Sequence, residues 1–223
     1  MRLIAVPLAR AFAYIQLDEL TLGTKIFLPS LMASLVQKCQ FQSSPSSLKD
    51  LNLHDGVVFE QGLFNGIVIR KLTVFPLVMH LDAADSTDDA QAALLGILQW
   101  TKEECGLRYS PEMINRWAYV SDVVFQTEFP LLDRINPVLN SVCSRISEIV
   151  QGNLKESLEY VPAKIWLAHD PSQRNASIAP FTIEHRALSL FSENIYYSEA
   201  PVPTREHISL LNKLESSLAI HEG

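Results

Sequence analysis

The stretch from Gly56 to Gly106 decides the fold, and it reads GVVFEQGLFNGIVIRKLTVFPLVMHLDAADSTDDAQAALLGILQWTKEECG. Two runs rich in β-branched and apolar residues, joined by a Gly-bearing turn, are typical of a β-hairpin. A third extended run, PLVMHLDA, follows, and then the apolar residues recur every three or four positions, as in a helix that ends at Gly106. Its predicted apolar stripe consists of Ala90, Ala93, Leu94, Ile97, Leu98, Thr101 and Cys105. The stretch therefore predicts three strands followed by a helix.

The same two patterns account for the rest of the chain. Arg2, Ile4, Val6 and Leu8 fall on one face of an extended segment, which favours a strand over a signal peptide at the N-terminus. Three more helices are predicted, over 27–39, 136–152 and 204–219, with Ile208, Leu211, Leu214 and Leu218 facing inward in the last. Further strand patterns lie within 116–129, 160–170, 179–191 and 194–200. Strands in runs with helices between them predict an α+β fold with an antiparallel or mixed sheet and about four helices.

The ends of the helix at 136–152 carry clear signals. Asn136 is a good N-cap, Pro137 suits the first helical position and Gly152 suits the C-cap. The preceding PLLDRI is either a separate turn or the beginning of the same helix, kinked at Pro137.

The predicted elements occur in the order β-α-β-β-β-α twice. Thr87 and Thr204 each open the last helix of a set, and Leu94 and Leu211 each follow seven residues later. We interpret this as a possible internal duplication, with one α+β unit in 1–110 and a second in 111–223, packed in one compact body. Such units would be related by a pseudo-twofold axis with a cleft between them.

The composition excludes several classes of function. The chain has 223 residues, 48% of them hydrophobic, and a net charge of −7 with no cluster of Lys and Arg, so duplex nucleic acid is not an expected partner. Only 8 glycines argue against a glycine-rich phosphate loop. No run of apolar residues is long enough to span a membrane.

Three cysteines, Cys39, Cys105 and Cys143, are far apart and odd in number. Each lies on an apolar helical stripe or at a helix end, so we expect buried free thiols in a reducing compartment, and hence a cytoplasmic protein. No pair of them has the spacing of a structural zinc site.

The segment HLDAADSTDD, residues 80–89, admits two interpretations. In the first, His80 and Asp82 share one face of a strand and join Asp85 and Asp88 in an oxygen-rich site for Mg²⁺ or Mn²⁺. In the second, Ser86 or Thr87 caps a helix whose first turn holds acidic residues, which the helix dipole favours. The second interpretation leaves only His80 and Asp82 unexplained, and we favour it.

Two other groups of residues are candidates for function. His169, Glu184 and His185 could supply an acid and a base to one cleft, or form salt bridges at loop edges. Tyr196 and Tyr197 alternate on a strand before a proline-containing arm; either the pair offers a ring to a protein partner, or a ring packs in the core with its hydroxyl bonded.

No catalytic motif of known mechanics occurs in the chain. We therefore predict a non-catalytic protein-binding or assembly component without a cofactor, which self-associates as a homo-oligomer and contacts partners through Tyr196 and Tyr197. The alternative is a divalent-metal-dependent hydrolase or nuclease that uses His80, Asp82 and Asp85. A third hypothesis, a sensor with a small ligand in the cleft between units, has no residue attached to it.

Overall fold

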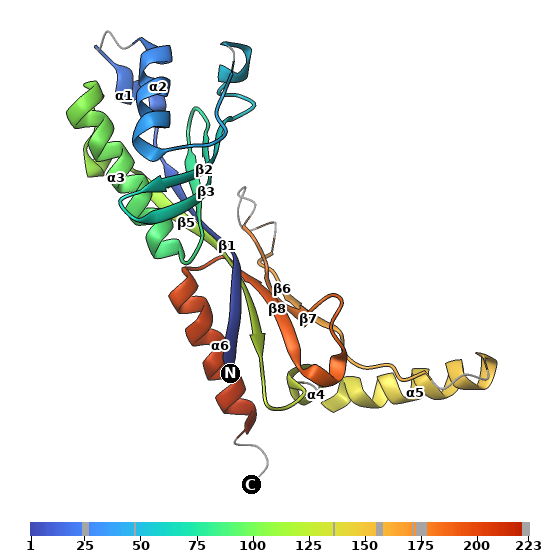
Figure 1. Cartoon of the computed structure of the whole chain (residues 1–223). Helices are drawn as coiled ribbons and strands as arrows, with labels where there is room; N and C mark the ends of the chain where they lie inside the picture. Colours follow the sequence, from blue (N-terminus) through green and yellow to red (C-terminus); the bar gives the residue numbers. More distant parts are fainter. Residues whose placement is uncertain are drawn as a thin grey trace. The chain divides into compact units, whose positions relative to one another are not determined.

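The computed structural model confirms the α+β fold (Figure 1). It describes residues 1–23, 27–46, 48–135, 137–154, 158–170, 172 and 178–219. The strands are β1 (Arg2–Tyr14), β2 (Val57–Phe64), β3 (Ile67–Val74), β4 (Met79–Ala83), β5 (Arg116–Gln126), β6 (Lys164–Leu167), β7 (Phe181–His185) and β8 (Ile195–Ala200). The helices are α1 (Leu17–Thr21), α2 (Leu28–Cys39), α3 (Thr87–Cys105), α4 (Leu131–Ile135), α5 (Pro137–Leu154) and α6 (Thr204–Ala219). Each predicted strand and helix has its counterpart here, and α1 and α4 are additional short helices.

The strands are hydrogen-bonded in the order β2-β3-β4-β1-β5-β8-β7-β6. The pairs β2–β3, β3–β4, β1–β4, β6–β7 and β7–β8 are antiparallel. Counted inward from one edge, the strands are β2, β3, β4 and β1. Counted inward from the other edge, they are β6, β7, β8 and β5, which is the same series if β5 to β8 are the counterparts of β1 to β4. A tandem duplication would produce such an order, and the duplication itself stays a prediction.

The predicted hairpin is formed by β2 and β3. Asn65 and Gly66 connect the strands with φ angles of 49° and 85°. Positive φ at both central residues is the requirement of a two-residue hairpin loop, and it matches the twist of the flanking strands. The β2–β3 ladder keeps one register on both sides of Gln61, whose φ is 56°, whereas a bulge between Ile69 and Lys71 shifts the register of the β3–β4 ladder.

The chain divides into two compact units. The N-terminal unit contains Val6–Ser121 with Pro201–Arg205, and the C-terminal unit contains Met1–Ala5, Asp122–Ala200 and Glu206–Gly223.

In the N-terminal unit, β1 presents three small, fully buried residues, Ala9, Ala11 and Ala13, to the core. Helix α3 lies along β3 and β4 and buries the predicted stripe from Ala90 to Thr101 (Figure 1). Burial of this stripe removes apolar surface from water and so stabilises the unit.

In the C-terminal unit, α6 buries Leu211 completely and Ile208, Leu214 and Leu218 in part, so the inward stripe of this helix is confirmed. In β7 of the same unit, Ile183 is also fully buried.

The end of α5 differs from the sequence prediction. Helix α5 runs through Gly152 to Leu154, so Gly152 is an interior residue of the helix and not its C-cap. PLLDRI forms the separate helix α4, which ends at Ile135. The predicted N-cap, Asn136, lies outside the described residues.

Within the described part of the chain, no helix is both long and apolar enough to cross a membrane. All three cysteines are free thiols. Cys39 is buried as expected, whereas Cys105 and Cys143 are only half-buried.

Candidate functional site

The acidic segment at 80–89 runs from the end of β4 into the start of α3. The Ser86 hydroxyl accepts the backbone N–H of Asp89 at 3.0 Å and donates to the Asp89 carboxylate at 2.6 Å. Ser86 is therefore the N-cap of α3, and Asp88 and Asp89 occupy its first turn, where the helix dipole favours negative charge.

Asp82 is engaged by a side chain that the sequence analysis did not consider. On the face of β4 opposite α3, both carboxylate oxygens of Asp82 accept hydrogen bonds from Arg10, at 2.5 Å and 2.7 Å. Arg10 and Asp82 are direct partners in the β1–β4 ladder, so the register places the guanidinium beside the carboxylate. A bidentate pair of this kind compensates the burial of Asp82.

His80 lies next to this ion pair in an aromatic environment. Its Nδ1 is 3.9 Å from Asp82 Oδ1, and its ring centroid is 5.3 Å from that of Phe12 and 5.9 Å from that of Phe75. Burial, followed by the positive charge of Arg10, lowers the pKa of His80 to about 4, although Asp82 acts in the opposite direction. The imidazole is therefore neutral at pH 7.

The structure thus brings His80 and Asp82 together, and it leaves Asp85 and Asp88 exposed at the start of α3. Across the ranges that the structure describes, no group of three or more His, Cys, Asp or Glu side chains is arranged to hold a metal ion.

The side chains of the second candidate group, His169, Glu184 and His185, do not meet in one site. Glu184 and His185 are adjacent in β7, so their side chains point to opposite faces. Glu184 forms an ion pair with Lys164 at 2.8 Å, whereas His185 stacks on Phe191 with ring centroids 3.9 Å apart. His169 lies beyond the end of β6, with Nδ1 3.0 Å from the carbonyl oxygen of Asp170.

The two tyrosines have different environments. Tyr196 is 0% exposed, and its hydroxyl accepts the backbone N–H of Leu131 at 2.9 Å. Its ring packs against Phe125 and leaves no surface for a partner in this conformation. Tyr197 is half-buried on the other face, where burial and a hydrogen bond to Asp122 raise the pKa of its hydroxyl.

A buried polar pair in the C-terminal unit escaped the sequence analysis. His207 of α6 and Ser198 of β8 are fully buried, with His207 Nε2 2.8 Å from Ser198 Oγ. Because Ser198 donates its proton to the carbonyl of Thr182 at 2.6 Å, Nε2 must donate to Ser198. Their burial makes this a structural hydrogen-bond chain. A lone His within an amphipathic helix gave no signal of it.

Helix α5 exposes its apolar stripe. Val138, Leu139, Val142, Ile146 and Ile149 are between 37% and 71% exposed. In Figure 1, α5 follows α4 and projects beyond the strands of its unit. The core therefore does not cover these five apolar side chains, whereas Val150 of the same helix is half-buried.

The returning chain covers a different side of α5. The Ser147 hydroxyl accepts the backbone N–H of Tyr160 at 2.8 Å, and the Gln151 side chain donates to the carbonyl of Leu158 at 2.9 Å. These bonds fix the segment 158–160 beside the stripe and leave the stripe itself open.

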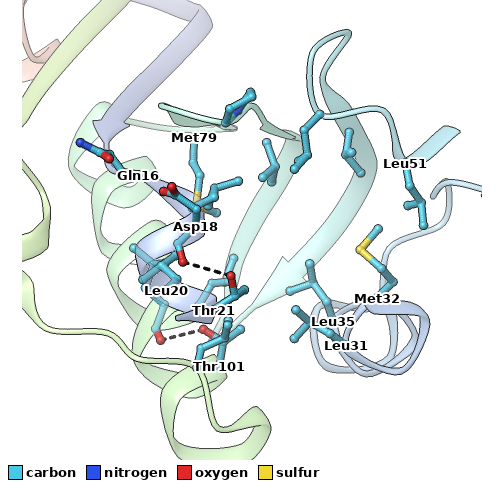
Figure 2. A pocket seen from close by; sticks show the side chains of 18 of the residues that line it. Gln16, Asp18, Leu20, Thr21, Leu31, Met32, Leu35, Leu51, Met79 and Thr101 are labelled. Atoms are coloured by element: carbon cyan, nitrogen blue, oxygen red, sulfur yellow. Dashed lines mark hydrogen bonds between the residues drawn. The ribbon is translucent and has the colours of Figure 1, made fainter. Parts of the chain in front are cut away.

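The N-terminal unit contains an apolar cavity of about 630 Å³ between α1, α2, α3 and the sheet (Figure 2). Aliphatic side chains and Phe59 form most of its wall. Among the described residues of the wall, the polar side chains are those of Gln16, Asp18, Thr21 and Thr101. No signal in the sequence marks this cavity, because its walls come from segments that are distant in the chain.

Comparison of the sequence with protein-family models and with curated proteins gives no match. Function must therefore be argued from the geometry of this chain.

Proposed function

We propose that the chain is a non-catalytic assembly component that associates with a second copy of itself through α5. The observation that carries the proposal is the exposed stripe on this helix. Contiguous apolar surface that the core does not use marks an interaction site in a soluble chain. The three free cysteines favour a reducing, cytoplasmic setting for this assembly.

The spacing of the stripe suits a second helix. Leu139, Val142, Ile146 and Ile149 follow one another at intervals of three, four and three residues, the a/d pattern of a coiled-coil seam. Such a seam is self-complementary, because the knobs of one copy fit the holes of an identical copy. A second copy is therefore the simplest occupant of the stripe.

Charge on α5 does not oppose this pairing. Its charged residues, Arg145 and Glu148, form an ion pair with each other at 2.7 Å. Neither lies on the seam, so two copies can meet without placing a charge in the contact.

The expected affinity is modest. Covering the exposed part of one seam side chain contributes about 1 kcal/mol, and two copies supply eight such side chains. Association costs about 4–15 kcal/mol because the two copies lose translational and rotational freedom. The free energy gained by covering the seam is therefore similar in size to the cost of association. A specific interface also buries about 800 Å² per partner, which requires neighbours such as the exposed Leu158 and Tyr160 to contribute.

Sedimentation velocity over a range of protein concentrations tests the proposal. We expect the wild type to dimerise, and Ile146→Glu to remain monomeric because it places a charge in the seam. Ser144→Glu is the matched control, since it adds the same charge to an exposed position of α5 off the seam. A monomeric wild type at every concentration, or dimers that Ile146→Glu does not weaken, would contradict the proposal.

A further inference from the structure

We infer that the cavity of the N-terminal unit binds an aliphatic small molecule with a hydrogen-bond donor, an alcohol or an amine, at one end. This inference does not depend on self-association, because the cavity and α5 belong to different units.

The cavity opens at the surface, where Gln16, Asp18 and Thr21 of its wall are exposed, and reaches into the core. Its wall includes core residues from α1, α3, two strands and the chain after α3, namely Leu20, Phe59, Met79, Ile97, Leu98 and Leu107. Across from them, α2 contributes Leu31, Met32 and Leu35. A concave site that helices and sheet line to this depth suits a small molecule better than the flat or convex surface of a protein partner.

The size and chemistry of the cavity agree with such a ligand. A volume of about 630 Å³ falls within the range of known ligand pockets, roughly 300–1,000 Å³. Water gains little in a space with aliphatic walls, because it needs several polar partners. An aliphatic chain would instead contact the walls throughout and be removed from water.

The polar groups lie together on one side. In Figure 2, Gln16 and Asp18 lie on the side of α1, away from Met32 and Leu51. The Asp18 carboxylate accepts one backbone N–H, that of Glu19, at 3.0 Å. The hydroxyls of Thr21 and Thr101 donate to carbonyl oxygens of their own helices, at 3.1 Å and 2.8 Å, so towards a ligand they can only accept.

These polar groups determine which chemical group the ligand can carry at its polar end. Among the residues that the structure describes, the wall of the cavity contains a carboxylate and no Lys, Arg or His side chain. A hydroxyl or ammonium group can donate to Asp18, whereas the carboxylate of a fatty acid would be repelled by it. The site therefore favours alcohols and amines over acids of the same chain length.

Displacement of the neutral fluorophore N-phenyl-1-naphthylamine from the full chain tests the inference. We expect the fluorophore to bind, dodecanol and dodecylamine to displace it, and dodecanoate to do so about tenfold less well. In Asp18→Asn, dodecylamine should still displace the fluorophore better than dodecanoate, but the ratio of the two concentrations needed should be severalfold smaller.

Met32→Trp fills the cavity from its half-buried α2 wall and should lose fluorophore binding while its thermal melt remains cooperative. Val68→Trp is the matched control, because Val68 is exposed on β3 outside the cavity. If Met32→Trp does not fold, Leu31→Trp offers a second filling variant on the same helix.

Failure of the wild type to bind the fluorophore, or equal binding by the filling variant and the control, would overturn the inference. So would displacement by an apolar peptide and by none of the amphiphiles, since the site would then take protein. Ile146→Glu should keep full binding, which separates this result from that of the self-association test.

Discussion

At the residue scale, His80 and Asp82 show how a strand neighbour determines the role of a side chain. From the sequence alone, both residues are candidates for a metal site. The β1–β4 register places Arg10 opposite Asp82 and Phe12 opposite His80. The carboxylate is thereby bound to a guanidinium, and the imidazole lies among aromatic rings.

The low pKa of His80 should appear in the stability of the protein. The folded pKa of about 4 lies below the usual 6.5, so below pH 6.5 the unfolded chain binds a proton that the folded chain does not. The contribution of His80 is complete above pH 6.5 and is lost as the pH falls towards 4. Between pH 7 and pH 4.5 this loss amounts to about 2 kcal/mol.

We expect His80→Phe to remove this loss, since a Phe ring suits the contacts with Phe12 and Phe75. Urea unfolding of wild type and variant at several pH values measures the difference in free energy of unfolding. His54→Gln, at an exposed position, serves as the control and should keep the wild-type pH dependence. Parallel pH profiles for wild type and His80→Phe would refute the assignment.

At the element scale, two glycines at similar places in the sequence have opposite roles. Gly106 follows α3 with a φ of 74°, in the left-handed region, whereas Gly152 lies inside α5. A Cβ added at either position would meet no atom of the described residues within 4 Å, so the backbone conformation distinguishes the two glycines.

Substitution by alanine should therefore change stability in opposite directions. Gly106→Ala should lower the free energy of unfolding by about 1 kcal/mol, because alanine is strained in the left-handed region. Gly152→Ala should raise it by about 0.5–1 kcal/mol, since alanine favours a helix interior. Urea denaturation of both variants gives the two values. If Gly152→Ala also lowered the free energy of unfolding, Gly152 would be the residue that ends the helix.

Helices α3 and α5 further show that a periodic pattern predicts a helix but not its environment. Both carry an apolar stripe, yet α3 buries Leu94 and Ile97 whereas α5 exposes Val142 and Ile146. The difference arises because α3 lies on β3 and β4, while α5 packs mainly against α4.

At the scale of the whole molecule, two observations agree with an internal duplication. The strand order is the same from both edges, and the two threonines that open α3 and α6 cap each other. The N–H of Thr87 donates to Thr204 Oγ1 at 3.1 Å, and the N–H of Thr204 donates to Thr87 Oγ1 at 2.8 Å. Each threonine thus accepts the N–H at the start of the other helix, and the duplication remains a prediction.

Self-association should also couple stability to concentration. If two copies bind through α5 in the folded state only, mass action raises Tm as the protein concentration increases. We expect a rise of a few degrees over a hundredfold range for the wild type. Ile146→Glu should melt at one temperature throughout, and a wild type that does the same would speak against the dimer. Differential scanning fluorimetry provides the measurement.

The sequence by itself determined the class of fold and the approximate places of its strands and of its four longer helices. Periodicity, the turn at Asn65-Gly66 and the cap at Ser86 are local properties, set by residues within a few positions of one another. They sufficed to favour a helix start at Ser86 or Thr87, which the structure confirms at Ser86.

Only the tertiary structure decided which polar groups meet and which apolar surfaces remain open. The pairs Arg10–Asp82 and Ser198–His207, the open stripe of α5 and the cavity beneath α2 depend on segments that strand order and helix packing bring together. Contacts of this kind leave no periodic trace in the chain, because nothing local constrains their spacing.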